Sequence, residues 1–287
     1  MNTMRMKSVL FGLATAFAAM GAMIGQSALA QVLGEGGDIS RQQDCEMCDL
    51  RNKVFSGSAL DGLTLRGAYL FGADFTKTSL IGVNFESANL TRSKFDRADL
   101  SGANLSKANL AKAAMFGVTL RGARLTFADL PGAYMEASEL SYADLTGANM
   151  EGAILRRAFV NNARLRSAHM KNVNLSDANL RLANLEGADL DGANLSGADL
   201  TLTSLAGASL RSADLRGANI SYTNMLGADL TGARLNNAQI NGANLRQAKF
   251  VDADLTGAMI SSVMLEATNF CHAKMPKGKI GICGESP

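Results

Sequence analysis

Residues 188–197 read ADLDGANLSG, two consecutive copies of a unit in which Ala, Asp or Asn, and Leu are followed by two further residues. The same period extends in both directions. From Leu50 to Phe270 every fifth residue is Leu, Ile, Met, Val or Phe, 45 positions without an insertion. Two residues before each lies a second column of mostly small residues, which Lys53 and Leu63 fit poorly. Such regularity over most of a 287-residue chain indicates a repeat architecture.

The five-residue period fits neither an α-helix, with 3.6 residues per turn, nor a β-strand, with a period of two. It fits a chain that turns a corner every five residues, with one large and one small side chain pointing inward and three residues facing outward. The composition agrees, since the chain has no Trp, three Pro and 6% aromatic residues. We therefore predict a solenoid whose core consists of the two inward columns.

The unit resembles A(D/N)LXX, the repeat of the pentapeptide-repeat family, and the resemblance covers residues 48–270 without a break. It implies an all-β fold, a right-handed quadrilateral parallel β-helix in which four units make one coil of twenty residues. At that rate the 45 units give about eleven coils. Strands spaced by about 4.8 Å would make the rod on the order of 50 Å long.

The charged residues test the coil length independently, because residues one coil apart lie side by side. Within the repeats, fourteen pairs at a spacing of twenty have opposite charges and two have like charges. Arg66 and Glu86 are one such opposite pair, and Glu136 and Arg156 are another. At a spacing of fifteen, eleven pairs are like and four are opposite. Both spacings are multiples of five, so the difference indicates a twenty-residue coil.

The first thirty residues have a different composition from the repeats. Arg5 and Lys7 precede an apolar stretch over residues 9–24, and Ala28-Leu29-Ala30 offers small residues at a cleavage site. This arrangement is typical of a secretory signal peptide cleaved after Ala30; the alternative is an uncleaved membrane anchor. We expect a periplasmic or secreted protein with no membrane segment in its mature form. Because the family has lumenal relatives in photosynthetic organisms, the thylakoid lumen is an alternative location.

The expected organisation is a signal peptide at 1–30, an N-terminal segment and cap at 31–47, the β-helix at 48–270, and a C-terminal cap and tail at 271–287. Without residues 1–30 the chain carries 26 basic and 26 acidic residues, because that segment contains two basic residues and no acidic one. A neutral rod has no net field to attract nucleic acid, so we expect no nucleic-acid partner.

Four cysteines flank the repeats: Cys45 and Cys48 before them, Cys271 and Cys283 after them. Of the three possible pairings, two would join opposite ends of the rod, far beyond the roughly 7 Å that a disulfide spans between Cα atoms. The expected disulfides are therefore Cys45–Cys48 and Cys271–Cys283, formed in an oxidising compartment. The tail from Phe270 to Cys283 is also similar to the C-terminal caps of exported pentapeptide-repeat proteins.

The C-x-x-C spacing of Cys45 and Cys48 leaves two other interpretations open, a labile redox-active disulfide and a metal site. The acidic neighbours Asp44, Glu46 and Asp49 disfavour a reactive thiolate, and no further metal ligands lie close by in the sequence. The two histidines are His169, at an outward position one coil from Asp189, and His272 in the tail. Lacking a nucleophile–base–acid group, a phosphate loop or a metal cluster, the sequence predicts no enzyme activity, cofactor or metal.

One outward column departs from the others. At a spacing of twenty its residues are Gly from Gly62 to Gly122, and five consecutive coils then carry Tyr142, Asn162, Leu182, Leu202 and Tyr222. We name Tyr142, Leu182, Leu202 and Tyr222 the apolar strip and predict that it binds a partner protein. The alternative is a stabilising ladder, or drift at a tolerant corner, with no partner.

These features favour a non-catalytic scaffold that binds an unidentified protein partner, with a homodimer as a further possibility. Two other functions compete. The family also includes DNA-mimicking inhibitors of type II topoisomerases, which are cytoplasmic, dimeric and strongly acidic, unlike this neutral chain with its export signal. A thiol-redox protein that uses Cys45 and Cys48 is the enzymatic alternative.

Overall fold

The computed structural model describes residues 45–283. The predicted signal peptide at 1–30, residues 31–44 of the predicted N-terminal segment, and the last four residues of the tail lie outside this range. Within it, no helix is long and apolar enough to cross a lipid bilayer.

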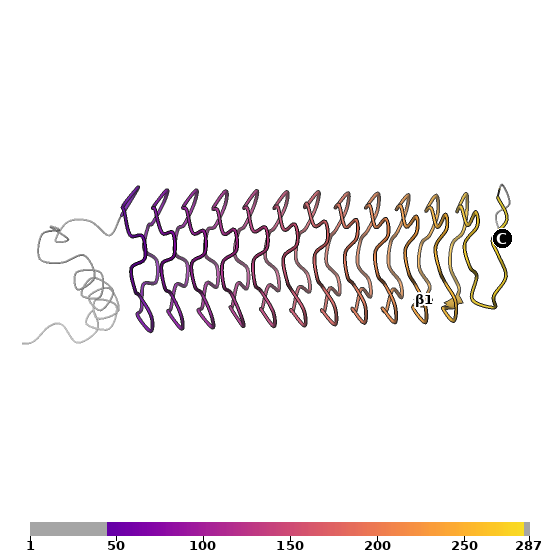
Figure 1. The fold of residues 1–287 in the computed structure, drawn as a ribbon, viewed down its shortest axis with the longest axis horizontal. Helices are drawn as coiled ribbons and strands as arrows, with labels where there is room; N and C mark the ends of the chain where they lie inside the picture. Colours follow the sequence, from indigo (N-terminus) through magenta and orange to yellow (C-terminus); the bar gives the residue numbers. More distant parts are fainter. Residues whose placement is uncertain (1–44, 284–287) are drawn as a thin grey trace, which may run out of the picture.

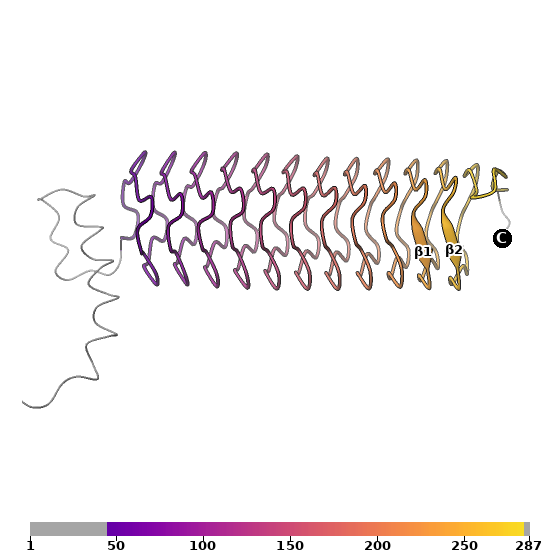
Figure 2. The ribbon, with the colours of Figure 1, turned by 90° about the horizontal axis from the view of Figure 1, so that it is seen from below.

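The described chain is a solenoid β-helix whose coils are stacked along one long axis, from residue 45 at one end to the C-terminal tail at the other (Figures 1 and 2). Parallel β-bridges join residues twenty apart, from Asp49 and Tyr69 to Asp254 and Lys274. This pairing distance agrees with the twenty-residue spacing of the opposite charges.

Extended segments are short because a two-residue turn interrupts the chain in every five-residue unit. Most bridges therefore involve single residues. Only β1 (Gln239–Asn241) and β2 (Met259–Ser261) are longer, and they pair in parallel with Gln239 opposite Met259. The five-residue period thus produces a parallel ladder with few strands of regular length.

The core consists of the two inward columns predicted from the sequence. The apolar residue of each unit is buried throughout, apart from Ile260 and Leu265, which are partly exposed in the last coil. Aromatic rings stack inside the rod one coil apart, with ring centroids 4.8 Å apart for Phe55 and Phe75 and 5.0 Å apart for Phe75 and Phe95. Burial of this column is the main source of stability.

Backbone hydrogen bonding explains why the second residue of the unit is Asp or Asn. Around Leu190, three of the unit's five N–H groups donate to carbonyls of adjacent coils, and Ala193 N donates back to Leu190 O across the turn. The fifth, on the first turn residue Asp191, has no such carbonyl and donates to Asp189 Oδ1 instead. The side chain therefore satisfies the one backbone donor that the ladder leaves over.

The second residue of each turn from Met47 to His272 lies in the left-handed region, with φ between 52° and 74°. Gly adopts this conformation without strain, yet many turns carry other residues there, including Tyr142 and Leu182. A large side chain at such a position costs about 1 kcal/mol or more of backbone strain. The residues that replace Gly in the apolar strip are therefore conformationally unfavourable.

The predicted charge pairs form in part. Of the fourteen opposite pairs at a spacing of twenty, seven lie within 4 Å, among them Arg66–Glu86 at 3.9 Å and Arg156–Glu136 at 2.5 Å. Asp144 shows why others do not form, because it pairs with Arg164 on one side and not with Arg124 on the other. A charge between two partners in adjacent coils engages only the one whose rotamer reaches it.

A reversal of the chain closes the C-terminal end of the rod. The tail folds back so that Ile280 pairs with Lys274 in antiparallel orientation, the one antiparallel bridge in residues 45–283. Met275 N donates to Lys279 O and Gly281 N donates to Ala273 O, both within 2.8 Å. An antiparallel return cannot template another parallel coil, so it ends the ladder.

Candidate interaction surface and capping cysteines

The apolar strip is exposed along consecutive coils. The exposed fractions are 56% for Tyr142, 52% for Leu182, 48% for Leu202 and 64% for Tyr222. Asn162 lies between Tyr142 and Leu182 in the same column and is partly buried. Each of these five residues donates its backbone N–H to a carbonyl of the next coil, which holds the column in line.

The side chain of Tyr222 leans along the rod over the next coil. A Cβ built on Gly242 would lie 2.6 Å from Cδ1 of Tyr222, so the Tyr222 ring occupies the space over that glycine. The first turn residues beside the strip, Ser141, Thr201 and Ser221, are buried to 6%, 7% and 8% exposure. These three turn residues are thus less exposed than most first turn residues of the rod.

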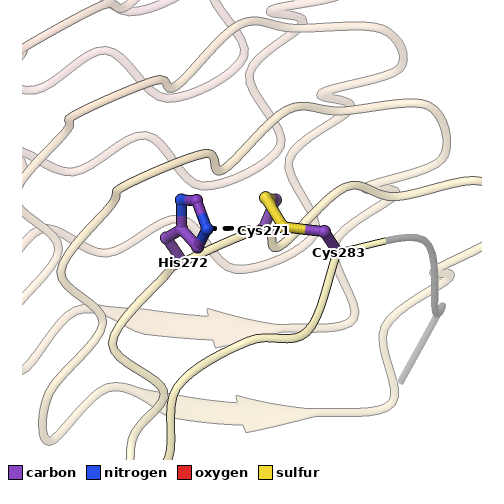
Figure 3. A group of neighbouring side chains, drawn as sticks. All are labelled: Cys271, His272 and Cys283. Atoms are coloured by element: carbon purple, nitrogen blue, oxygen red, sulfur yellow. Dashed lines mark hydrogen bonds between the residues drawn. A yellow bond between two sulfur atoms is a disulfide. The ribbon is translucent and has the colours of Figure 1, made fainter.

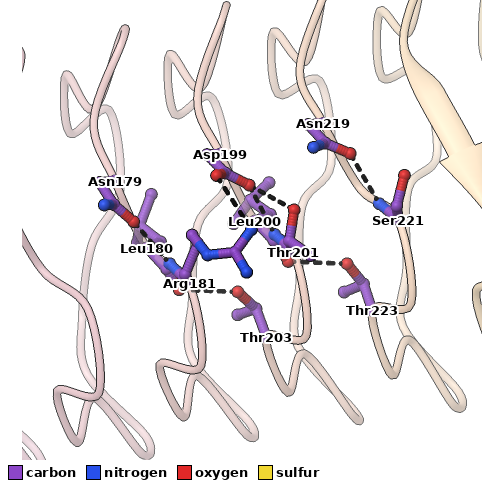
Figure 4. Close-up of polar contacts among 10 residues, drawn as sticks. All are labelled: Asn179, Leu180, Arg181, Asp199, Leu200, Thr201, Thr203, Asn219, Ser221 and Thr223. Carbon is purple, nitrogen blue, oxygen red and sulfur yellow. Dashed lines mark hydrogen bonds and ion pairs between the residues drawn. The ribbon is translucent and has the colours of Figure 1, made fainter.

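The polar groups beside the strip are satisfied within the rod (Figure 4). Asp199 accepts hydrogen bonds from the hydroxyl and the N–H of Thr201 and lies 3.5 Å from Arg181 Nη1. Thr203 and Thr223 point inward, and their hydroxyls donate to carbonyl oxygens at 2.8 Å. With these groups already paired, the strip offers apolar contact more than hydrogen bonding.

Sequence reasoning missed one neighbour of the strip. The guanidinium carbon of Arg121 lies 5.6 Å from the centroid of the Tyr142 ring. A cation over a ring face is attractive, and this pair holds the ring at one end of the strip. In the sequence this contact corresponds to a spacing of twenty-one residues. A comparison of residues twenty apart, within one column, does not detect it.

Exposed aromatic residues also occur away from the strip. Phe127 is 63% exposed in another column, and its ring lies over Gly147 as the ring of Tyr222 lies over Gly242. Tyr134 and Phe116 are exposed in two further columns. Phe127 and Phe116 have no large apolar neighbour in their columns, and Tyr134 has one, Ile154. The strip instead places four apolar residues in five consecutive coils, interrupted by Asn162.

Both predicted cysteine pairs lie at disulfide distance. The Cα atoms of Cys45 and Cys48 are 5.5 Å apart, and those of Cys271 and Cys283 are 4.3 Å apart. Cys45 is buried at the start of the core, and Cys283 lies on the returning tail beside the last coil.

The structure adds to the C-terminal pair a residue that the sequence did not link to it. Nε2 of His272 lies 3.5 Å from Sγ of Cys283 (Figure 3), and Nδ1 lies 3.4 Å from Oδ1 of Asp252. Cys271, His272 and Cys283 are the one group of three metal-ligating side chains in residues 45–283. The sequence predicted no such cluster, because the path of the tail is not encoded in the repeat.

The other histidine, His169, is exposed, as its outward position predicts. Its backbone pairs with that of Asp189 in the next coil, but the Asp189 carboxylate lies 3.4 Å from Lys171 Nζ. The Asp189 carboxylate is therefore paired with Lys171, eighteen residues earlier in the chain. Lys171 thus competes with His169 for Asp189, the residue that the position of His169 suggested as its partner.

Comparison with known families agrees with this architecture. The family described as "Pentapeptide repeats (8 copies)" matches residues 48–86, 84–122, 120–157, 161–197, 198–237 and 238–275. The chain therefore belongs to the pentapeptide-repeat family. No curated protein matches it in a sequence comparison.

Solved structures of pentapeptide-repeat proteins are similar to this chain. HetL, involved in heterocyst differentiation regulation in the cyanobacterium Nostoc sp. strain PCC 7120, is 31% identical with a TM-score of 0.53. That match covers 84% of this chain and 94% of HetL. A pentapeptide-repeat protein from the Arabidopsis thaliana thylakoid lumen is 35% identical over 34% of this chain and 64% of its own, with a TM-score of 0.20.

Proposed function

We propose that this protein is an exported, non-catalytic scaffold that binds a partner protein along the apolar strip. The observation that carries the proposal is a line of four half-exposed Tyr and Leu side chains within five consecutive coils, beside polar groups that are already paired. In keeping with the resemblance, we take the coils to be four-sided and right-handed and about eleven in number.

The strip has the dimensions of a helix-binding surface. From Tyr142 to Tyr222 it advances four coils, or about 19 Å at roughly 4.8 Å per coil. That length corresponds to about three and a half turns of an α-helix. A narrow apolar line fits the apolar stripe of an amphipathic helix, so we infer that the partner presents such a helix.

The cost of building the strip also supports a binding role. Tyr142, Leu182, Leu202 and Tyr222 occupy left-handed positions that Gly would adopt without strain. Burial of an apolar side chain against a partner contributes about 25 cal/mol per Å² and offsets that strain in the complex. A stabilising ladder along the rod, without a partner, is the competing structural role.

Site-specific photo-crosslinking in the native host tests the proposal. A benzoyl-phenylalanine at position 202 should capture a partner of different sequence, and the same group at position 127 should not, although Phe127 occupies an equivalent turn position. Capture of only a second copy of this chain at position 202 would favour the homodimer instead.

The partner so identified, once purified, permits a quantitative test. The double variant Leu182→Ser/Leu202→Ser should bind it at least tenfold more weakly by calorimetry, because both substitutions remove apolar area without breaking a backbone bond. Phe127→Ser is the matched control and should bind as the unaltered protein does. Equal affinity of the double variant would show that the strip has only a structural role.

Export and the two disulfides belong to the same proposal. A signal peptide cleaved after Ala30 would deliver the chain to an oxidising compartment, where the pairs at both ends of the rod persist as disulfides. N-terminal sequencing of the mature protein should begin at Gln31, and non-reducing mass spectrometry should find no free thiols. Recovery of Met1 from a membrane fraction would contradict the export proposal.

The alternative of a DNA mimic has weaker support. Such a protein needs a strongly acidic surface, whereas residues 31–287 are neutral and seven of the opposite charge pairs lie within 4 Å. We expect no effect on DNA supercoiling by gyrase; inhibition in that assay would favour the mimic. Activity in an insulin-reduction assay would instead favour the thiol-redox alternative.

A further inference from the structure

The C-terminal cap groups three side chains with the chemistry of zinc ligands. The ligand atoms of Cys271, His272 and Cys283 all lie within 4.8 Å of one another (Figure 3). The Sγ atom of Cys283 is 3.5 Å from Nε2 of His272. Zn–S and Zn–N bonds of about 2.3 and 2.05 Å at a tetrahedral angle place the two ligand atoms about 3.6 Å apart. The observed distance therefore matches one edge of a zinc tetrahedron.

Asp252 orients the histidine for this role. Its Oδ1 lies 3.4 Å from Nδ1 of His272, on the ring nitrogen opposite the one that faces Cys283. Metal-bound histidines commonly donate the second ring N–H to a carboxylate, which fixes the tautomer and makes the other nitrogen a better ligand. The cap thus contains a carboxylate–histidine pair with the free nitrogen directed at a sulfur atom.

Backbone hydrogen bonds also fix the position of the tail. Gly281 N donates to Ala273 O at 2.8 Å, and His272 N donates to Gly281 O at 3.1 Å. These bonds hold the tail beside the last coil two residues before Cys283. A Cβ on residue 281 would lie 1.9 Å from Phe270 O, so the close approach requires Gly at this position.

We propose that reduction of Cys271–Cys283 creates a zinc site formed by Cys271, Cys283 and His272, with Asp252 as the orienting carboxylate. This proposal rests on Cys271 and Cys283 forming a disulfide in the oxidised protein. A dithiol reductant supplies two electrons and two protons, becomes a disulfide itself, and leaves two thiols on the chain. Zinc then displaces both thiol protons, and water fills the fourth position.

The disulfide and the metal exclude each other, because two sulfurs bonded to one another are not available as thiolates. In the zinc site the sulfurs separate to about 3.8 Å, as two Zn–S bonds at a tetrahedral angle require. Cys283 is exposed, so such a movement meets little packing. The cap therefore has two alternative closures, a disulfide under oxidising conditions and zinc under reducing ones.

Cobalt titration tests the inference, since Co²⁺ occupies tetrahedral thiolate sites and absorbs visible light. The protein is the Cys45→Ser/Cys48→Ser variant, in which only the C-terminal pair remains. After reduction with a phosphine, it should bind one Co²⁺ per chain with thiolate-to-metal charge-transfer absorption, and Zn²⁺ should displace the cobalt. The oxidised protein should show no such absorption, and its appearance there would overturn the proposal.

Two further variants in the same background separate ligation from simple thiol binding. His272→Ala should weaken Co²⁺ binding by a factor of ten or more, and Asp252→Asn should weaken it by a factor of about 10 to 100. Asp177→Asn, at a turn position equivalent to that of Asp252 but in mid-rod, is the control and should have no effect. Unchanged affinity in His272→Ala would overturn the proposal.

Discussion

At the scale of single residues, most polar groups in this rod have a defined partner. Thr203 and Thr223 occupy the small inward column, and each hydroxyl donates to a carbonyl in a neighbouring coil at 2.8 Å. Ser138 occupies the same column, but its buried Oγ has no hydrogen-bond partner. A buried hydroxyl without a partner costs about 1–3 kcal/mol, whereas a paired one contributes about 1 kcal/mol.

This difference predicts opposite effects for two similar substitutions. Ser138→Ala should leave the free energy of unfolding unchanged or raise it by up to about 1 kcal/mol, because it removes only an unpaired group. Thr203→Ala should lower it by about 1 kcal/mol, because it removes the hydroxyl's hydrogen bond to Leu180 O, which then accepts only from Ala183 N. Urea unfolding followed by circular dichroism measures both. A loss of stability in Ser138→Ala comparable to that in Thr203→Ala would contradict the prediction.

The turn aspartates make stability depend on pH. Hydrogen bonds from the Thr256 hydroxyl and N–H, aided by Lys274, lower the pKa of Asp254 from 3.8 to about 2. Similar contacts lower the pKa values of Asp74, Asp214 and Asp229. Because the folded pKa is depressed, the contribution is complete above about pH 4 and is lost as the pH falls towards 2.

Asp254→Asn should therefore weaken the loss of stability between pH 4 and 2, since an amide oxygen can accept the same turn hydrogen bonds without titrating. Asp254 is partly exposed, so its share after solvent screening is below about 1 kcal/mol. Thermal melting from pH 2 to 7 checks this. The same pH dependence in the variant as in the unaltered protein would show that Asp254 does not contribute.

At the scale of the coil, the inward apolar residue stabilises the fold. Its position along the rod determines how much free energy of unfolding it contributes. Leu190 is fully buried between neighbouring coils, whereas Leu265 is partly exposed in the last coil. The cost of truncation to Ala depends on how much apolar packing surrounds the side chain and on the cavity left behind. The two positions are equivalent in the unit but not in their surroundings.

Leu190→Ala should lower the free energy of unfolding by about 3 kcal/mol, within the range measured for buried leucines. Leu265→Ala should cost less than about half as much, because fewer atoms surround it. Guanidinium unfolding of both variants, with a check that the transition remains cooperative, gives the comparison. Equal losses would show that the last coil is packed as tightly as the middle of the rod.

At the scale of the whole molecule, charge alternates along the rod. Residues 129–151 carry five acidic and no basic side chains, and residues 156–171 carry five basic and no acidic ones. These segments occupy successive coils, so opposite charges face each other and the long-range field cancels. The charged side chains therefore contribute to the register in which the coils stack.

The returning tail should keep the rod from stacking end to end. A chain that stops after Pro276 loses the antiparallel pairing at Lys274 and exposes Ile260, Leu265 and Phe270 at an open parallel edge. We expect it to form larger assemblies than the full chain in sedimentation velocity. A chain that stops after Cys283 keeps the cap and is the control. Identical behaviour of both would show that the tail does not protect the end.

The repeat itself predicts most of this architecture. Unit length, the two buried columns from Leu50 onward, and the pairing distance of twenty are all readable from period and charge, because each unit meets the same surroundings one coil further along. The apolar strip was equally visible as a break in a glycine column at Tyr142. Its exposure follows from its outward position in the turn.

Features outside the period required the folded chain. Whether Asp144 engages Arg124 or Arg164 depends on rotamers, and the cover that Tyr222 provides over Gly242 depends on the direction in which a ring leans. The approach of His272 to Cys283 depends on a tail that leaves the repeat and reverses direction. A periodic sequence specifies the contacts that recur in every coil; contacts made once, at an end or between alternative partners, arise only when the whole chain is packed.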